Sequence, residues 1–276
     1  MIFNNKEFSC YNDDFIGKLN TLYNKTNAYL DKHFESEVKQ NKNKLCQRIT
    51  EMMIISKLID AGINLSKNHN SAPDVDVLID LDRNEQVWIE CVTPSIGKSQ
   101  VLKELPNKIE SCSEFVEIPY DDLAPRITSV VVEKSKKYKK HISMVKTKAM
   151  PILIINTSLL PVGFDQRYIG LFEGWKDPHV IFSRNSNDDH SNQLYVFPSD
   201  KIIKPDSKAS IPTKFFSQND FPFQIVILSG EMISCFSSQP LNIELINPKY
   251  LKTIKISQSI TKIRNALKSD IDWSQY

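Results

Sequence analysis

Glycine is scarce in this chain, with only 7 residues in 276. A loop that cradles phosphate groups needs glycines at fixed positions, because only glycine lets the backbone come that close to the ligand. Neither the GxxxxGK[ST] pattern nor the GxGxxG pattern occurs. The scarcity argues against P-loop nucleotide hydrolases and against dinucleotide-binding enzymes.

Paired cysteines and long apolar runs are also missing. The five cysteines are odd in number and no two have CxxC spacing, which argues against a disulfide framework and a structural zinc site. This cysteine usage is typical of a reducing compartment, so we expect a cytoplasmic protein. No apolar run approaches the roughly 18 residues that a membrane-spanning helix needs. We therefore expect no membrane partner.

Other catalytic signatures and a strong net charge are absent too. The five histidines form no HExxH motif, and no serine lies in a GxSxG motif. The 35 basic and 33 acidic residues give a net charge of +2, which does not by itself indicate a nucleic-acid partner. Five lysines crowd into seven positions, at Lys134, Lys136, Lys137, Lys139 and Lys140. Such a run fits a solvated helix face as well as a binding surface.

The first half of the chain predicts helices followed by a hairpin. Residues 1–44 are polar with apolar residues at helical spacing, which favours one or two amphipathic helices forming an N-terminal extension. Residues 45–61 predict a stronger helix that Gly62 ends. Residues 74–80 alternate apolar and polar side chains, and residues 87–92 are apolar apart from one glutamate. Because the connection is short, these two strands should form an antiparallel hairpin.

The second half predicts a helix, a central strand and peripheral elements. A helix is expected from Pro125 to about residue 146, and residues 150–156 are typical of a buried central strand. Further strands are expected at residues 168–172, 180–182, 194–197, 223–228 and 232–236, and a final helix at residues 254–268. We interpret residues 45–276 as a single domain, with its core at residues 45–156 and peripheral additions at residues 157–276.

Three carboxylates in the core could meet at one point. Hydrolysis of phosphodiesters by hard divalent cations requires oxygen ligands from separate elements. Asp74 opens the first hairpin strand, Glu90 lies on its partner, and Glu51 lies on the preceding helix. Each has an ordinary alternative: Asp74 as a turn cap, Glu90 in an ion pair, and Glu51 on a solvated helix face. Their joint order favours a metal site.

This order resembles the PD-(D/E)XK nuclease superfamily over residues 45–156. The residues that carry the resemblance are Pro73-Asp74, the tripeptide Glu90-Cys91-Val92, the helical Arg48-Ile49-Thr50-Glu51, the Glu-x-x-x-Pro spacing from Glu90 to Pro94, and the helix from Arg126 to Tyr138. The resemblance implies a restriction-endonuclease-like α/β/α core with a central mixed sheet and helices on both faces, plus peripheral strands and a C-terminal helix. It also implies Mg²⁺ or Mn²⁺ held by Asp74 and Glu90, with Glu51 assisting, in a nuclease that acts on DNA.

The chain departs from the family at Val92, where the family has a lysine. That lysine positions or activates the attacking water and stabilises charge in the transition state. Lys134 is our candidate replacement, because it shares a helix face with Arg126 and Tyr138 at i, i+4 spacing. We expect Arg126, Lys134, Lys137 and Tyr138 to contact nucleic acid.

Two functions therefore remain in competition. The first is a divalent-metal-dependent nuclease, for which a homodimer would suit cleavage of both strands. The second is a catalytically degenerate nuclease-fold module that binds nucleic acid or protein. Delivery into another cell as a bacterial effector stays open for either function.

Overall fold

The computed structural model describes residues 2–3, 12–66, 75–81, 85–111, 116–142, 148–161, 167–173, 175–182, 192–198, 201–203, 209–230, 242–251, 258–269 and 271. Asp74, expected at the start of the first hairpin strand, lies outside these residues. The expected strand at residues 232–236 lies outside them as well.

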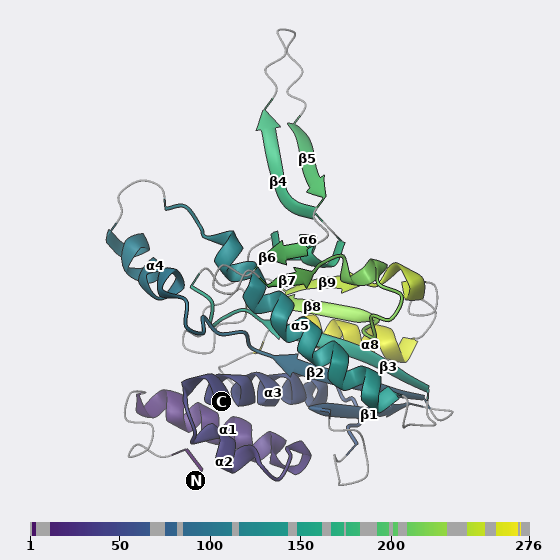
Figure 1. Cartoon of the computed structure of the whole chain (residues 1–276). Helices are drawn as coiled ribbons and strands as arrows, with labels where there is room; N and C mark the ends of the chain where they lie inside the picture. Colours follow the sequence, from purple (N-terminus) through teal and green to yellow (C-terminus); the bar gives the residue numbers. More distant parts are fainter. Residues whose placement is uncertain are drawn as a thin grey trace.

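A five-stranded mixed sheet forms the centre of the structure, in the order β1-β2-β3-β8-β9 (Figure 1). Its strands are β1 (Val77–Leu81), β2 (Glu85–Val92), β3 (Lys148–Asn156), β8 (Ile225–Ser229) and β9 (Asn242–Ile246). The β1–β2 and β8–β9 pairs are antiparallel, whereas β2, β3 and β8 run parallel. The expected mixed sheet and its antiparallel hairpin are confirmed.

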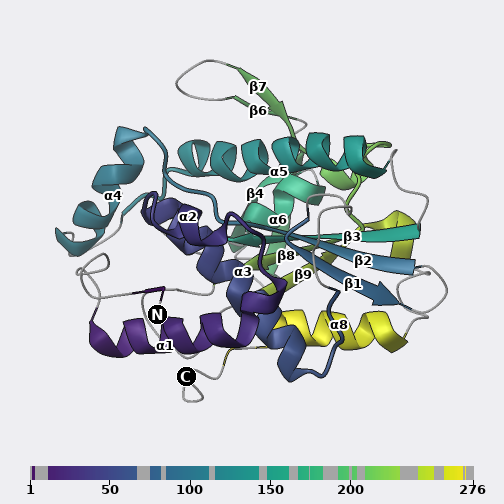
Figure 2. The same ribbon diagram turned by 90° about the horizontal axis from the view of Figure 1, so that it is seen from below.

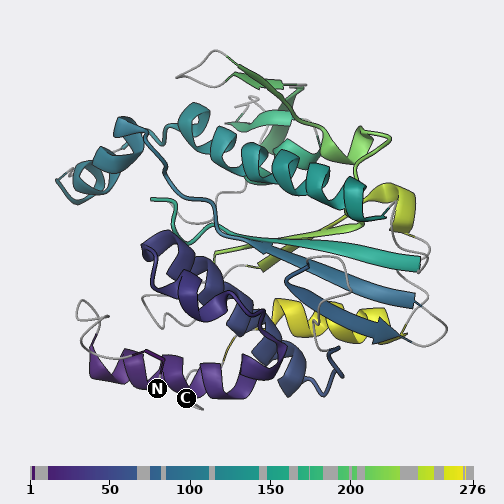
Figure 3. The same ribbon diagram turned by 60° about the horizontal axis from the view of Figure 1, so that its bottom comes forward.

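Helices cover both faces of this sheet, as Figure 2 and Figure 3 show. The helices are α1 (Asp13–Thr26), α2 (Phe34–Val38), α3 (Lys42–Asp60), α4 (Gln100–Ser111), α5 (Tyr120–Ile142), α6 (Arg167–Glu173) and α8 (Gln258–Lys268), with short 3-10 turns η1 (Asn27–Tyr29), η3 (Phe215–Ser217) and η4 (Pro248–Tyr250). Side chains of α5 and α6 pack on one face, and those of α3 and α8 on the other. Helices α1 and α2 pack on the outer side of α3. The protein is therefore an α/β protein with helices on both sides of its sheet.

Helix α3 has well-defined signals at both ends. Asn41 caps its start, where the side-chain oxygen accepts a hydrogen bond from the Lys44 N–H at 3.0 Å. At its end Gly62 adopts a positive φ of 64°, and the Ile63 N–H donates to the Leu58 carbonyl at 2.9 Å. This Schellman geometry favours glycine, because a side chain is strained at such a φ. The prediction that Gly62 ends the helix is confirmed.

Helix α3 is buried on two sides. Its sheet-facing residues are Ile54, Ile55 and Leu58, and its residues facing α1 and α2 are Leu45, Ile49, Met52 and Met53. The polar Arg48 and Glu51 are buried with them, at 6% and 3% exposure. Because buried charges must be paired, these two side chains require partners inside the protein.

Strand β3 occupies the centre of the sheet, as its apolar sequence predicts. Ile152 and Ile154 face α3 and α8, while Leu153 and Ile155 face α5 and α6. A strand with parallel neighbours on both edges and helices on both faces has no solvated side. This explains why residues 150–156 lack the alternation of an ordinary half-exposed strand.

Several predicted elements need correction. Residues 168–172 form part of helix α6 rather than a strand: Tyr168, Leu171 and Phe172 are all buried, at the i, i+3, i+4 spacing of a helix face. Helix α5 begins at Tyr120, so Pro125 lies inside it rather than at its start. Strand β9 was not expected from the sequence.

Peripheral strands form two small antiparallel pairs apart from the main sheet. They are β4 (Trp175–Phe182) with β5 (Asn192–Pro198), and β6 (Lys201–Ile203) with β7 (Ser210–Pro212). The β4–β5 pair, where the sequence predicts strands, projects away from the body in Figure 1. Within the described ranges, no helix has both the length and the apolar character needed to cross a membrane.

Substituting Leu22 by alanine should destabilise the protein by about 2–5 kcal/mol, because truncating a fully buried leucine leaves a cavity. Leu22 on α1 is 0% exposed, in the cluster that joins α1 to α3. Denaturant unfolding measures the change. The matched control is Val101→Ala on α4, where the side chain is 44% exposed and a change below about 0.5 kcal/mol is expected. Equal stability of the two variants would contradict this packing.

Candidate functional site

Glu90 is a buried carboxylate on an apolar face of the sheet. It is 0% exposed and lies on β2 between Trp88 and Val92, which both pack against α5. The Lys134 ammonium of α5 donates a hydrogen bond to Glu90 Oε2, and Lys137 Nζ lies 3.2 Å from Glu90 Oε1. The sequence expectation placed Lys134 near this site, and the structure brings the two side chains together.

Asp76 lies beside Glu90 across the hairpin. The register pairs Val77 with Ile89, so one further step places Asp76 opposite Glu90. The Cys91 N–H donates to Asp76 Oδ2 at 2.6 Å, which holds this carboxylate at the same end of β2. Burial, followed by repulsion from Asp76, raises the pKa of Glu90 to about 7, although Lys134 and Lys137 act in the opposite direction.

Glu51 supplies a third carboxylate from α3. Burial and then the charge of Asp76 raise the pKa of Glu51 to about 8, against the lowering effect of Arg48. Its neighbour Thr50 lies 3.2 Å from Thr93, oxygen to oxygen, and accepts a hydrogen bond from Asn156 at 3.1 Å. These bonds tie α3 to the residue that follows β2 and to the last residue of β3. The charge of Asp76 thus acts on both Glu51 and Glu90 at the carboxyl end of the parallel strands.

Arg48 connects this site to the N-terminal helices. Its Nη1 donates to Glu51 Oε2 at 2.6 Å, and its Nη2 lies 2.7 Å from Asp31 Oδ2 and 2.8 Å from Glu37 Oε2. Three carboxylates thus surround one buried guanidinium. The arrangement holds the Glu51 side chain in a fixed position.

The Lys134 ammonium remains charged. Burial lowers the pKa of Lys134, but attraction to Asp76 and Glu90 more than offsets this and raises the pKa above its usual value. A lysine held in this way is a permanent positive charge and a hydrogen-bond donor, and it cannot act as a general base.

The donor set is chemically suited to a hard divalent cation, which prefers carboxylate oxygens. The charge of Asp76 raises the pKa of both Glu51 and Glu90, and a cation beside Asp76 would offset that repulsion. Lys134 and Lys137 provide positive charge beside Glu90, and Arg48 provides it beside Glu51. Among the described residues, no three acidic, histidine or cysteine side chains lie close enough together to hold a metal ion.

Asp76 is the residue that sequence reasoning missed. The alternation of residues 74–80 gives Asp74, Asp76 and Asp80 the same strand face, so it cannot choose among them. Only the register across the turn places Asp76 opposite Glu90. Asp74 lies outside the described residues.

Tyr138 does not form part of an exposed binding surface. It is 0% exposed, and its ring packs edge-on against Trp88, with 5.5 Å between centroids, and at a tilt against Phe223, with 5.0 Å between centroids. Burial, Glu90 and Asp76 raise the pKa of its hydroxyl, which keeps its proton. The expected contact with nucleic acid is therefore corrected to a core position, because the helical stripe that suggested it faces the sheet.

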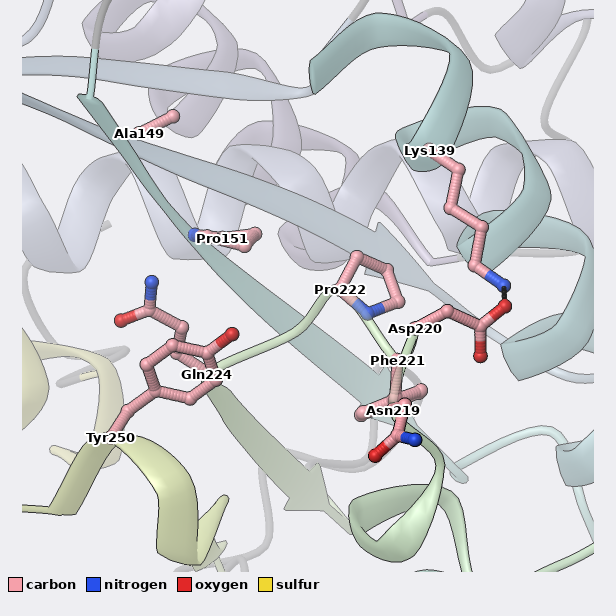
Figure 4. A pocket seen from close by; sticks show the side chains of 9 residues that line it. All are labelled: Lys139, Ala149, Pro151, Asn219, Asp220, Phe221, Pro222, Gln224 and Tyr250. Carbon is pink, nitrogen blue, oxygen red and sulfur yellow. Dashed lines mark hydrogen bonds and ion pairs between the residues drawn. The ribbon is translucent and has the colours of Figure 1, made fainter. Parts of the chain in front are cut away.

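An open groove of about 410 Å³ lies elsewhere on the same side of the sheet (Figure 4). Ala149 and Pro151 line it at the amino end of β3, and the Lys139–Asp220 ion pair lies at one side. Glu90 pairs with Leu153, farther along β3. The acidic site is thus not part of this groove.

Substituting Asp76 by asparagine should stabilise the protein at pH 8 in EDTA. The raised pKa values of Glu51 and Glu90 mean that their contribution to stability is present at low pH and is lost as pH rises through about 7 to 8. Without the Asp76 charge, Glu51 and Glu90 lose less of this stabilisation as the pH rises. The free energy of unfolding should therefore increase by about 1–3 kcal/mol at pH 8 and hardly change at pH 5.

Denaturant unfolding at the two pH values measures this difference. Asp80→Asn is the matched control, because Asp80 is an exposed acid on β1. An identical pH dependence in Asp76→Asn and the unsubstituted protein would rule out the charge coupling.

No protein-family model, curated protein or solved structure matches this chain. The likeness to PD-(D/E)XK nucleases therefore rests on the residues of the chain itself.

Proposed function

We propose that the chain is a divalent-metal-dependent nuclease that hydrolyses phosphodiester bonds, with DNA as its substrate. One observation carries the proposal: Asp76 and Glu90 lie together across a hairpin, with a charged lysine on Glu90. A mixed sheet with helices on both faces and this hairpin at one edge is compatible with a restriction-endonuclease-like fold. The metal pair that we propose is Asp76 and Glu90, in place of the Asp74 and Glu90 expected from sequence.

Mg²⁺ or Mn²⁺ at these carboxylates would polarise the phosphodiester and make a bound water more acidic. Asp76 and Glu90 would hold the ion, and Glu51 would orient water from the α3 side. Without the ion, burial and the charge of Asp76 raise the pKa of Glu51 to about 8, and a cation on Asp76 would remove part of that shift.

Lys134 is proposed to stand in for the family lysine that Val92 replaces. Val92 is buried, and its apolar side chain offers no charge. Lys134 is 16% exposed and reaches Glu90 from α5, so its ammonium lies at the same carboxylate from a different element. There it would stabilise negative charge that develops on the phosphate.

A second function is favoured by a different observation. Lys134 and Lys137 pair with Glu90, and Arg48 pairs with Glu51, so the chain neutralises these acids with its own cations. This fits a catalytically inert module that keeps the nuclease scaffold and binds nucleic acid or protein. The two functions differ in a measurable way, because the inert module should neither bind Mn²⁺ at Glu90 nor cleave DNA.

Asp76→Ala and Glu90→Gln should each lower Mg²⁺-dependent DNA cleavage by on the order of 100-fold or more, because each removes a proposed metal ligand. Cleavage of a labelled duplex in Mg²⁺ measures the loss, and circular dichroism checks folding. Asp80→Ala, on the same strand, should keep full activity. Loss of activity in Asp74→Ala with full activity in Asp76→Ala would show that Asp74, and not Asp76, is the metal ligand.

Lys134→Met should lower kcat by about 10-fold or more while Mn²⁺ binding is kept or strengthened, because Lys134 competes with the ion for Glu90. Single-turnover kinetics and Mn²⁺ titration measure the two effects separately. Lys136→Met is the control, because Lys136 is exposed on the same helix. Equal kcat in the two variants would contradict the role of Lys134.

A further inference from the structure

Arg126 carries a half-buried guanidinium to which the described residues give no partner. It lies on α5, two helical turns before Lys134, and its Nε is enclosed without a hydrogen-bond partner. Within the part of the chain that the structure describes, its guanidinium makes no hydrogen bond and no ion pair. The enclosed Nε–H is unfavourable, since it has lost water and gained no hydrogen bond. The missing anion can come from a ligand.

The loop after β2 is shaped around this guanidinium. Gly97 has a φ of 59°, and a Cβ placed on it would collide with Arg126 Nη1 and lie 3.1 Å from Cζ. Any side chain at position 97 would therefore push the guanidinium away. Glycine satisfies two needs here, the positive φ and the close approach.

The nearby acid is already engaged by the same loop. Ser99 Oγ donates to Asp122 Oδ1 at 3.1 Å, one helical turn before Arg126. The next residue after Gly97 is the exposed Lys98, which adds a second positive charge. The loop after β2 and helix α5 thus contribute one cation each to this part of the protein.

We infer that Arg126 and the 95–99 loop form a phosphate-binding site separate from the acidic cluster. A planar guanidinium with unused N–H groups matches the oxygens of a phosphate better than an ammonium does. Eight residues of helix place Arg126 about 12 Å from Lys134. Successive phosphates of one strand rise about 3.4 Å along the axis of duplex DNA and lie farther apart than that in space. A strand with its scissile phosphate at Glu90 would therefore reach Arg126 within a few nucleotides.

The assignment of this phosphate to a nucleic-acid strand rests on the proposed nuclease function, whereas the phosphate chemistry of Arg126 does not. Binding is therefore measured in EDTA, where no metal-dependent cleavage takes place. The probes are a fluorescein-labelled 12-mer DNA, single-stranded and duplex, and inorganic phosphate. Anisotropy over a series of KCl concentrations gives Kd and its salt dependence for DNA, and thermal shift reports phosphate against chloride at equal ionic strength.

Arg126→Gln should weaken DNA binding about tenfold and lower the slope of log Kd against log salt by about 1. The control is Lys136→Gln, which removes one exposed charge from the same helix and should change Kd less than about twofold. Arg126→Lys keeps the charge and should recover only part of the affinity. Gly97→Ala should weaken binding without any loss of charge, which a purely electrostatic surface would not show.

DNA affinity unchanged in Arg126→Gln and Gly97→Ala, with no Arg126-dependent phosphate stabilisation, would overturn the inference even if the protein cleaves DNA. Arg126-dependent DNA binding without cleavage would support the phosphate site and count against the nuclease. Arg126-dependent stabilisation by inorganic phosphate alone would support the site and assign it to a free phosphate ligand. Should Arg126→Gln fail to fold, Arg126→Lys and Gly97→Ala decide the question.

Discussion

The burial of the Glu90 carboxylate is the constraint on which the rest of the site depends. A charged group between Trp88 and Val92 has no water to solvate it, so it is tolerable only with a cation at hydrogen-bonding distance. Helix α5 supplies that cation through Lys134, with Lys137 one turn later on the other oxygen. The position of α5 over β2 is therefore set by charge as well as by apolar packing.

A series of charged side chains continues from this point through the layers of the protein. Asp76 lies beside Glu90 and acts on Glu51, Glu51 is held by Arg48, and Arg48 is held in turn by acids before α3. Each layer of structure contributes at least one member. Such clustering of mutually perturbed groups is typical of functional sites, where the electrostatic cost is offset by packing elsewhere.

Local signals explain what the sequence could predict. Helix α3, its end at Gly62, the β1–β2 hairpin and the central β3 all follow from apolar periodicity and turn residues. The approach of Lys134 to Glu90 was predictable because helical spacing places Lys134 on a defined face of its helix.

Non-local geometry explains what the sequence could not predict. The choice of Asp76 as the partner of Glu90 depends on the strand register, and residues of one strand face are equivalent until that register is known. The bonds of Arg48 to Asp31 and Glu37 require α2 to be docked on α3. Residues 168–172 were assigned to a strand because a short apolar run has no clear period, and only its burial pattern identifies a helix.

Arg48 contacts three acids, so the pKa of Glu51 depends on whether the N-terminal helices are docked on α3. If α2 leaves α3, Arg48 loses Asp31 and Glu37 and turns its whole charge toward Glu51, which lowers the proton affinity of that carboxylate. A shortened chain that begins at α3 would therefore have a site of different acidity even if its sheet were intact. Residues before α3, far from Glu90 in sequence, thus tune the acid–base behaviour of the core.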